Sequence, residues 1–297
     1  MKRENNIDTE RLSQRAPIHW YPGHMAKAKR EMQQVLKIAD VAVEVVDARA
    51  PMSTRNPDLD KLLCQKPRVI ILNKEDLADN NATKQWQQYF TEQGWIAVSF
   101  CAKRQGGRDK LMAAMQKAAQ PLIDKWAQKG AKKMVRVMIT GIPNVGKSSV
   151  INCLSGGQRA KTGATPGVTR GKQWVRLSGT MELLDTPGIL WPKLSDEQGA
   201  KRLAFVNAIR DEVLEKDEIA MALVENLSYA APKAIQTRFQ VETAEKTPEE
   251  ILEGIGRRRG FIVKGGEVDT EKAAVVLIDE FRSGKLGRIT LERPAKA

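Results

Sequence analysis

One octapeptide restricts the folds open to this chain more than any other feature of its sequence. Residues 141–148 read Gly-Ile-Pro-Asn-Val-Gly-Lys-Ser, which matches the phosphate-binding pattern G-x-x-x-x-G-K-[ST]. A β-branched run precedes it at residues 135–140, and a helix-forming run follows at residues 149–154. This order lets loop N–H groups and a helix N-terminus face phosphate oxygens. We therefore predict a phosphate site here and not a chance glycine-rich turn.

The residue types in this loop indicate separate tasks. The Lys147 ammonium is expected to reach the β- and γ-phosphates, which makes it a candidate catalytic group, and the Ser148 hydroxyl is expected to bind Mg²⁺. The residues expected to contact the nucleotide phosphates are Asn144, Val145, Gly146, Lys147, Ser148 and Ser149.

Charge and composition point to a polyanionic partner. The 297 residues include 49 Lys and Arg against 36 Asp and Glu, a net charge of +13, and such an excess attracts phosphates without sequence preference. A generally basic protein is the alternative. Aromatic residues make up only 5%, so base stacking on an aromatic platform is not the expected binding mode.

Cysteine usage and hydropathy bear on the compartment. Cys64, Cys101 and Cys153 are scattered and odd in number, which indicates neither a zinc site nor a disulfide framework and fits a reducing compartment. We find no apolar run of transmembrane length and no signal or transit peptide. The sequence therefore predicts a cytoplasmic protein without a membrane span.

Strands and helices alternate over most of the chain. This pattern predicts an α/β fold with a doubly wound, mostly parallel sheet. The expected strands are residues 41–46, 68–72, 95–99, 135–140, 173–177 and 181–184, and the expected helices between them are residues 26–38, 58–63, 81–93 and 107–129.

Beyond about Pro192 only helices are expected. They are residues 197–210, 212–225, 232–239, 248–256 and 270–284, with Gly265-Gly266 between the last two. We predict a flexible tail at residues 1–17, an α/β domain at 18–192 and a smaller all-helical domain at 193–297.

A second motif selects the base. Asn73-Lys74-Glu75-Asp76 directly follows a predicted buried strand. The Asp76 carboxylate can accept hydrogen bonds from the ring N1–H and the exocyclic amine of guanine, whereas adenine presents no such pair. Asn73 would contact the opposite edge and the Lys74 stem would flank the base. Alone, N-K-x-D is mostly a strand-to-turn cap, but with the phosphate loop it selects GTP or GDP.

Further nucleotide contacts are expected after other strands. Cys101 and Ala102 stand where the S-A-K loop of guanine sites touches the guanine oxygen. Asp185 follows another strand and would hold Mg²⁺ through water, with the Gly188 N–H on the γ-phosphate. Thr169 is the candidate switch threonine that closes on Mg²⁺ and the γ-phosphate during catalysis, and Thr165 is its competitor.

The order of these motifs is unusual, because the base-reading elements precede the phosphate loop. A circular permutation would keep the spatial order of the sheet, since domain termini often lie close together. The nucleotide domain would then end just after Asp185–Gly188, so the helical region would be attached to the γ-phosphate sensor. We hypothesise that the helical region reads out the nucleotide state.

With these motifs in place, the sequence resembles the circularly permuted GTPases of the ribosome biogenesis GTPase A (YlqF) family. The resemblance covers roughly residues 18 to 192 and rests on Trp20-Tyr21-Pro22-Gly23-His24-Met25-Ala26-Lys27-Ala28, Asp47-Ala48-Arg49-Ala50-Pro51, Asn56-Pro57, Asn73-Lys74-x-Asp76, Gly141–Ser148 and Leu184-Asp185-Thr186-Pro187-Gly188-Ile189-Leu190-Trp191-Pro192. Gly265-Gly266 and Lys285-Leu286-Gly287-Arg288 are weaker matches in the helical part. A sister family with an oligonucleotide-binding barrel and a zinc site is disfavoured.

The resemblance implies a GTPase acting late in assembly of the large (50S) ribosomal subunit. The GTP form would bind immature subunits through rRNA and ribosomal proteins, and hydrolysis would release it. It also implies that the helical domain binds RNA, and we expect a monomer. Two rivals stay open: a GTP-gated RNA-binding module whose hydrolysis is incidental, and a GTPase acting on another RNA such as tRNA.

Activation of water needs an unusual source here. Ile189 occupies the position where many GTPases place a glutamine, so intrinsic turnover should be low. The resemblance suggests that His24 swings toward the γ-phosphate when the ribosome binds, with a structural turn or an RNA contact as alternatives.

Asn144 resembles the asparagine of potassium-activated GTPases, so K⁺ is a candidate cofactor beside Mg²⁺. A hydrogen bond that stabilises the loop is the alternative for Asn144.

Three basic clusters could contact RNA phosphates. They are Lys27/Lys29/Arg30, Lys129/Lys132/Lys133 and Arg257/Arg258/Arg259. Each alone is more often a solvated face, and if they bind RNA the binding should depend on salt.

Overall fold

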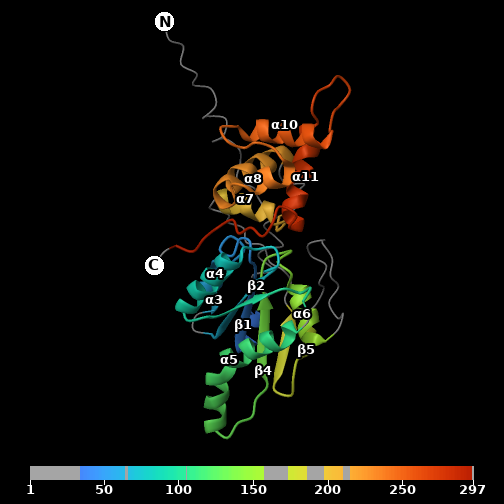
Figure 1. The fold of residues 1–297 in the computed structure, drawn as a ribbon. Helices are drawn as coiled ribbons and strands as arrows, with labels where there is room; N and C mark the ends of the chain where they lie inside the picture. Colours follow the sequence, from blue (N-terminus) through green and yellow to red (C-terminus); the bar gives the residue numbers. More distant parts are fainter. Residues whose placement is uncertain are drawn as a thin grey trace.

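A six-stranded sheet is the centre of this computed structural model (Figure 1). The structure describes residues 34–63, 66–104, 106–156, 173–185, 197–209 and 215–295. The strands lie in the order β3-β2-β1-β4-β6-β5, and all neighbouring pairs are parallel except β5 with β6. Their bounds are β1 Val41–Asp47, β2 Arg68–Asn73, β3 Ile96–Phe100, β4 Val135–Thr140, β5 Gln173–Arg176 and β6 Met181–Asp185.

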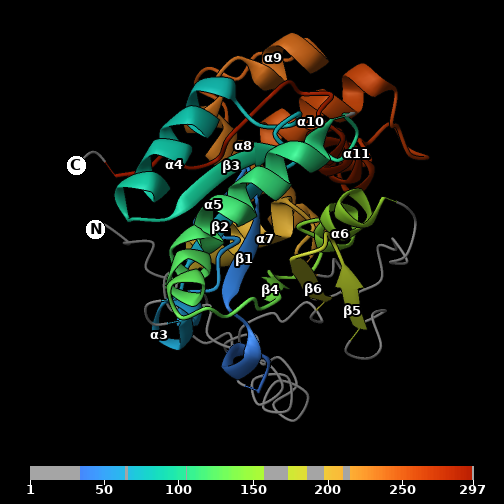
Figure 2. The same cartoon turned by 90° about the horizontal axis from the view of Figure 1, so that it is seen from below.

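Helices cover both faces of the sheet, as near-continuous apolar strands require (Figures 1 and 2). Val43 and Val45 of β1 face the core under α5 (Gly107–Gln128) and α6 (Lys147–Ser155). Their neighbours Ala42 and Val46 face the cores under α3 (Asp58–Leu63) and α4 (Asn80–Glu92). The predicted α/β fold with a doubly wound, mostly parallel sheet is confirmed.

The parallel register brings the motif-bearing loops to one edge. Asp47 at the end of β1 lies opposite Asn73, and Asn73 lies opposite Phe100. On the other side of β1, β4 and β6 end together, with Ile139 opposite Asp185. Although the base motif precedes the phosphate loop in the sequence, only β1 separates their two strands in space.

The remaining helices pack on one another above this carboxyl edge (Figure 1). They are α7 Glu197–Phe205, α8 Lys216–Ala230, α9 Ala234–Phe239, α10 Pro248–Arg259 and α11 Thr270–Ser283. Along the described part of the chain, no helix combines the length and apolar character needed to cross a membrane.

Several predicted helix boundaries in this region were wrong. Residues 197–210 were expected to be one helix, but α7 ends at Phe205 and Asn207 takes a positive φ of 60°, which an α-helix does not contain. Residues 212–225 were also expected to be helical, whereas α8 runs from Lys216 to Ala230. Its buried side chains extend to Leu227, so packing on α10 and α11 sets its end.

Gly265-Gly266 lies in a turn and not simply in a break between helices. Ile262 and Val268 form an isolated antiparallel bridge on either side of it. Ile262 and Val263 are exposed, with 49% and 43% of their surfaces accessible. This turn extends from the end of α10 and is absent from the sequence-based expectation, which placed only helices here.

After α11 the chain returns to the sheet (red in Figure 1). Residues 285–293, which we call the C-terminal strap, pass between the helices and the carboxyl edge. Leu286, Ile289 and Leu291 are buried in the main core. The Ile289 N–H donates to Leu77 O at 3.0 Å and the Leu291 N–H donates to Arg49 O at 2.7 Å. The strap therefore joins the helical part to two loops of the sheet.

A network of charged side chains surrounds a fully buried carboxylate of β1. Glu44 of β1 has no exposed surface and lies 3.3 Å from the Arg55 guanidinium and 3.9 Å from Arg68. Both guanidinium groups also pair with Asp60 and stack on the Trp95 ring at 4.6 and 4.3 Å. Burial acts to lower the pKa of Arg55, but Glu44 and Asp60 raise it by more, so the Arg55 guanidinium stays charged.

We predict that Glu44→Ala destabilises the protein strongly, because two buried guanidinium groups lose a partner. The expected loss is about 3 kcal/mol of unfolding free energy. Glu182→Ala is the matched control, since it breaks the half-exposed pair with Arg136 on the same sheet and should cost at most about 1 kcal/mol. Chemical denaturation measures both, and equal losses would contradict the role of the buried network.

Candidate nucleotide site

The phosphate loop connects β4 to α6 and depends on two glycines. A Cβ on Gly141 would lie 2.5 Å from Val45 O in the neighbouring strand, so the loop leaves the sheet too closely for a side chain. Gly146 has a φ of 95°, and a Cβ there would lie 2.1 Å from Asn73 Nδ2. Both positions thus need glycine for the loop to keep this path.

Helix α6 begins at Lys147, so its first N–H groups open toward the loop. Ser148 and Ser149 lie in that first turn. The Lys147 Nζ donates to Ile142 O at 2.9 Å and thus reaches back across the loop. A helix N-terminus, an ammonium group and a hydroxyl side chain meet at one place, which is the donor set that phosphates need.

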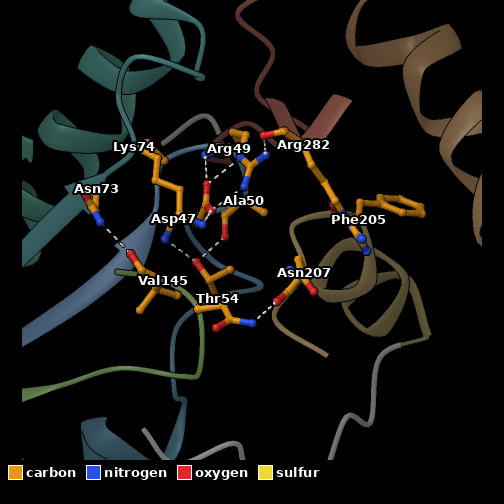
Figure 3. A network of polar contacts seen from close by, with 12 residues as sticks. Asp47, Arg49, Ala50, Thr54, Asn73, Lys74, Val145, Phe205, Asn207 and Arg282 are labelled. Atoms are coloured by element: carbon orange, nitrogen blue, oxygen red, sulfur yellow. Dashed lines mark hydrogen bonds and ion pairs between the residues drawn. The ribbon is translucent and has the colours of Figure 1, made fainter. Parts of the chain in front are cut away.

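Asn73 joins the base-reading loop to the phosphate loop. Its Nδ2 donates to Val145 O at 2.7 Å, as Figure 3 shows, and the residue is only 2% exposed. Its Oδ1 has no hydrogen-bond partner within the described ranges of the chain. A buried acceptor without a partner is costly, so this atom fits a ligand that brings a donor.

Asp76 presents its carboxylate beside the loop that follows β3. The Lys103 Nζ lies 3.4 Å from Asp76 Oδ2, and 80% of the Lys103 side chain is exposed. Burial acts to raise the pKa of Asp76, but hydrogen bonding from Cys101 and the charge of Lys103 lower it by more. Asp76 is therefore an ionised acceptor, as recognition of the N1–H and amine of guanine requires.

The same two loops are tied together by backbone. The Glu75 N–H donates to Phe100 O at 3.2 Å, and the Glu75 carboxylate pairs with Arg104 at 3.2 Å. Cys101 and Ala102 follow Phe100 directly. The structure thus brings Asn73, Asp76 and the Cys101-Ala102 segment to neighbouring positions, as the sequence predicted.

Lys74 takes part in a charged cluster that the motifs alone did not reveal (Figure 3). Its Nζ lies 2.9 Å from Asp47 Oδ2, and Asp47 also pairs with Arg49 at 2.8 Å. Burial raises the pKa of Asp47, but Arg49 and Lys74 lower it by more, so the net value lies well below its usual range. Asp47 and Arg49 entered the sequence analysis only as part of a family motif; acidic and basic residues directly after a buried strand were the available signal.

Arg49 extends this cluster to the helical part. Its Nη1 donates to Arg282 O at 3.3 Å, and its guanidinium lies 5.4 Å from the centre of the Phe281 ring. Arg282 in turn donates to Phe205 O and Ala204 O at the end of α7. One chain of polar contacts therefore runs from Lys74 to α11 and α7.

Asn144 makes a second contact of this kind. Its Nδ2 donates to Asn207 O at 2.7 Å, and both residues have positive φ values of 61° and 60°. The phosphate loop is thus bonded directly to the turn after α7. This matches the expectation of a stabilising hydrogen bond, although the partner lies in the helical part and not within the loop.

Several predicted site residues lie outside the described part of the chain. These are His24, Thr165, Thr169, Gly188 and Ile189.

Asp185 ends β6 beside Ile139 of β4, so its backbone is at the carboxyl edge near the phosphate loop. In the described ranges, no three His, Cys, Asp or Glu residues gather as a metal cage. Mg²⁺ bound by one or two protein groups and substrate phosphates needs no such cage.

The basic clusters do not form one surface. Arg257, Arg258 and Arg259 end α10 and are exposed, whereas Lys132 and Lys133 follow α5 just before β4. Figure 1 shows these two places at opposite ends of the molecule. Lys27, Lys29 and Arg30 belong to the residues that the structure does not describe.

We predict that Gly146→Ala weakens GDP binding at least about tenfold, because the new Cβ displaces Asn73 and distorts the loop; this corresponds to about 1.4 kcal/mol. Gly156→Ala is the matched control. Gly156 ends the same helix with a φ of 69°, but no atom lies within 4 Å of its Cβ position. Fluorescence titration with labelled GDP measures both, and equal affinities would contradict the close-approach requirement.

Comparison with known proteins agrees with this geometry. A family model described as 50S ribosome-binding GTPase matches residues 136–253. Ribosome biogenesis GTPase A of Bacillus cereus is 42% identical over 278 residues, covering 93% of this chain and 94% of that protein. The Thermotoga maritima protein of the same name is 35% identical over 277 residues, covering 93% of this chain and 95% of that protein.

Solved structures show the same relationship. GNP-bound YlqF from T. maritima has a TM-score of 0.64 at 31% identity and covers 91% of this chain and 100% of that chain. A GDP-bound YlqF structure has a TM-score of 0.66 at 30% identity, covering 90% and 100%. With its phosphate loop, guanine motif and permuted strand order, the chain is a GTPase and belongs to the ribosome biogenesis GTPase A family.

Proposed function

We propose that this GTPase is a switch in late assembly of the large (50S) ribosomal subunit. In its GTP form it would bind immature subunits, and hydrolysis would release it. The observation that carries the proposal is the Asn144–Asn207 hydrogen bond, which joins the phosphate loop to the helical part. A partner held by the helices can therefore act on the atoms that surround the phosphates. The relatives' names supply the partner, a ribosomal particle.

Guanine recognition is assigned to the loops after β2 and β3. Asp76 accepts from the guanine N1–H and amine, Asn73 Oδ1 accepts from a water bound at the opposite edge of the base, and Lys74 flanks the ring. Glu75, Cys101 and Ala102 complete the pocket through backbone. The buried Oδ1 of Asn73, which has no hydrogen-bond partner among the described residues, and the ionised Asp76 support this assignment.

Phosphate binding is assigned to the loop and the start of α6. The N–H groups of Asn144 to Ser149 surround the β-phosphate, and the Lys147 ammonium exchanges Ile142 O for phosphate oxygens. This exchange needs no movement of the backbone, since Lys147 already spans the loop.

The residues present fit a magnesium ion. Ser148 offers a hydroxyl at the start of α6, and Asp185 ends the adjacent strand β6. These two, with Thr169, would hold Mg²⁺, and Gly188 would meet the γ-phosphate. When bound, the ion neutralises charge that develops on the phosphate oxygens.

Activation of water is assigned to His24, because Ile189 cannot orient a water molecule. His24 and Ile189 both lie outside the residues that the structure describes, so this assignment rests on the family resemblance. Low activity of the isolated protein and a rise on the ribosome are its consequences.

Binding to rRNA is assigned to the exposed basic end of α10 and the adjoining turn. Arg257, Arg258 and Arg259 each have a protein partner, but their side chains stay at the surface. Lys264 and the exposed Ile262 and Val263 extend this face. The protein is proposed to be a cytoplasmic monomer that gains its affinity from phosphate contacts.

The test is the GTP hydrolysis rate in K⁺ buffer, with and without purified large ribosomal subunits. We expect a rise of at least about tenfold with subunits, equivalent to about 1.4 kcal/mol of barrier, because the subunit completes the water-activating group. Small subunits and tRNA are the controls. Stimulation by tRNA alone, or unchanged rates with measurable GTP binding, would contradict the proposal.

The same assay in Na⁺ buffer tests the potassium proposal. If Asn144 is a K⁺ ligand, the wild type is faster in K⁺ and Asn144→Ala shows equal rates in both salts. If Asn144 serves only the bond to Asn207, the variant keeps the wild-type ratio of the two rates.

A further inference from the structure

The C-terminal strap lies directly on the loop that reads the base. Arg288 of the Lys285-Leu286-Gly287-Arg288 segment donates from Nε to Ala78 O at 2.8 Å and from Nη2 to Glu75 O. The next residue, Ile289, donates its N–H to Leu77 O at 3.0 Å. Three carbonyl oxygens that follow Lys74 in the chain are therefore held by two adjacent residues of the strap.

The strap also fixes the end of this loop. The Thr290 hydroxyl accepts from the Asp79 N–H at 3.1 Å and lies 3.4 Å from Ala48 O, to which it can donate. The Arg293 guanidinium pairs with the Asp79 carboxylate at 3.0 Å. Asp79 is the N-cap of α4, so the strap holds the whole connection from the base motif to that helix.

The end of α11 packs against the same loop. Gly284 follows α11 with a φ of 79°, and a Cβ there would lie 2.7 Å from Leu77 Cδ2. The helical part and the base-reading loop are thus in contact through packing as well as through hydrogen bonds.

A loop of this shape needs support from outside. Lys74 has a φ of 60°, a conformation that non-glycine residues rarely adopt and that surrounding structure must hold. Asp76 lies between the carbonyl groups that Arg288 holds. Reading two donors of one base with one carboxylate requires placement to within about 0.5 Å. Unsupported, the loop could shift by more than that.

We propose that Arg288 is a positioning residue for guanine recognition and that the C-terminal strap is part of the base site. Arg288 fixes the loop so that the Asp76 carboxylate meets both guanine donors. This inference rests on the proposed role of Asp76. The strap continues from α11, so it connects the helical part to the loop that binds the guanine base. A partner that binds the helices would therefore change guanine affinity, and the nucleotide would change the affinity for that partner by the same factor.

The test compares affinities for GDP and for inosine diphosphate, which lacks the exocyclic amine that Asp76 is assigned to bind. In the wild type we expect GDP to bind about tenfold more tightly, because the analogue leaves a charged acceptor without its second donor. In Arg288→Ala the GDP affinity should fall and the preference should shrink at least about threefold, since a misplaced carboxylate gains little from the amine. Arg288→Lys, which can reach a carbonyl, should restore part of it.

Arg136→Ala is the control, because Arg136 pairs with Glu182 near the start of β4, at the end of the sheet away from the base loop. It should keep the wild-type preference. Arg288 is exposed, so its loss should not unfold the protein, and a partly unfolded sample would lower the number of sites without changing the preference. An unchanged preference in Arg288→Ala, or equal weakening of both nucleotides, would overturn the proposal.

The Asp76→Asn variant distinguishes the role of Asp76 in binding the base from the role of the strap in positioning Asp76. If Asp76→Asn loses the preference and Arg288→Ala retains it, only the role of the strap is wrong. If Asp76→Asn retains the wild-type preference, the base site itself is wrong and the strap proposal fails with it.

Discussion

The common direction of the strands is the constraint on which this structure depends. Because β1, β2, β3, β4 and β6 are parallel, their carboxyl ends meet at one edge. Every described loop assigned to the nucleotide leaves from that edge, whatever its position in the sequence. The chain order can therefore be permuted while the site stays assembled. The Asn73–Val145 bond joins the base-reading and phosphate-binding loops across β1 and makes them one unit.

The helical part packs on the same edge, so its residues contact the loops assigned to the nucleotide directly. The contacts between them include those of Asn144 with Asn207, of Arg49 with Arg282, and of the strap with the base loop. The first involves the phosphates, the second the charged cluster around Asp47, and the third the base. Each joins a loop of the sheet to a backbone or side chain of the helices or the strap. In the switch that we propose, such contacts would couple the nucleotide to the helical part.

Sequence patterns predicted the parts of the fold that repeat locally. The strands and the phosphate loop follow from apolar runs and glycine spacing, and the neighbours of Asn73 and Asp76 follow from parallel strands. The position of the strap could not be predicted in this way, because Arg288 and Glu75 are 213 residues apart and no periodicity connects them. The end of α8 depends on which face packs on α11, and the pairing of Lys74 with Asp47 depends on tertiary placement. The helix and strand propensities of the residues do not predict these tertiary contacts.

Hydrogen exchange of the strap amides tests most directly whether the base site and the helical part are one unit. The N–H groups of Ile289 and Leu291 donate to Leu77 O and Arg49 O, and they exchange when those contacts open. Saturating GDP should slow both amides at least about tenfold, whereas the Ala131 amide at the far end of α5 should keep its rate. Protection of the phosphate loop by GDP without any change at Ile289 and Leu291 would show that the two parts are independent.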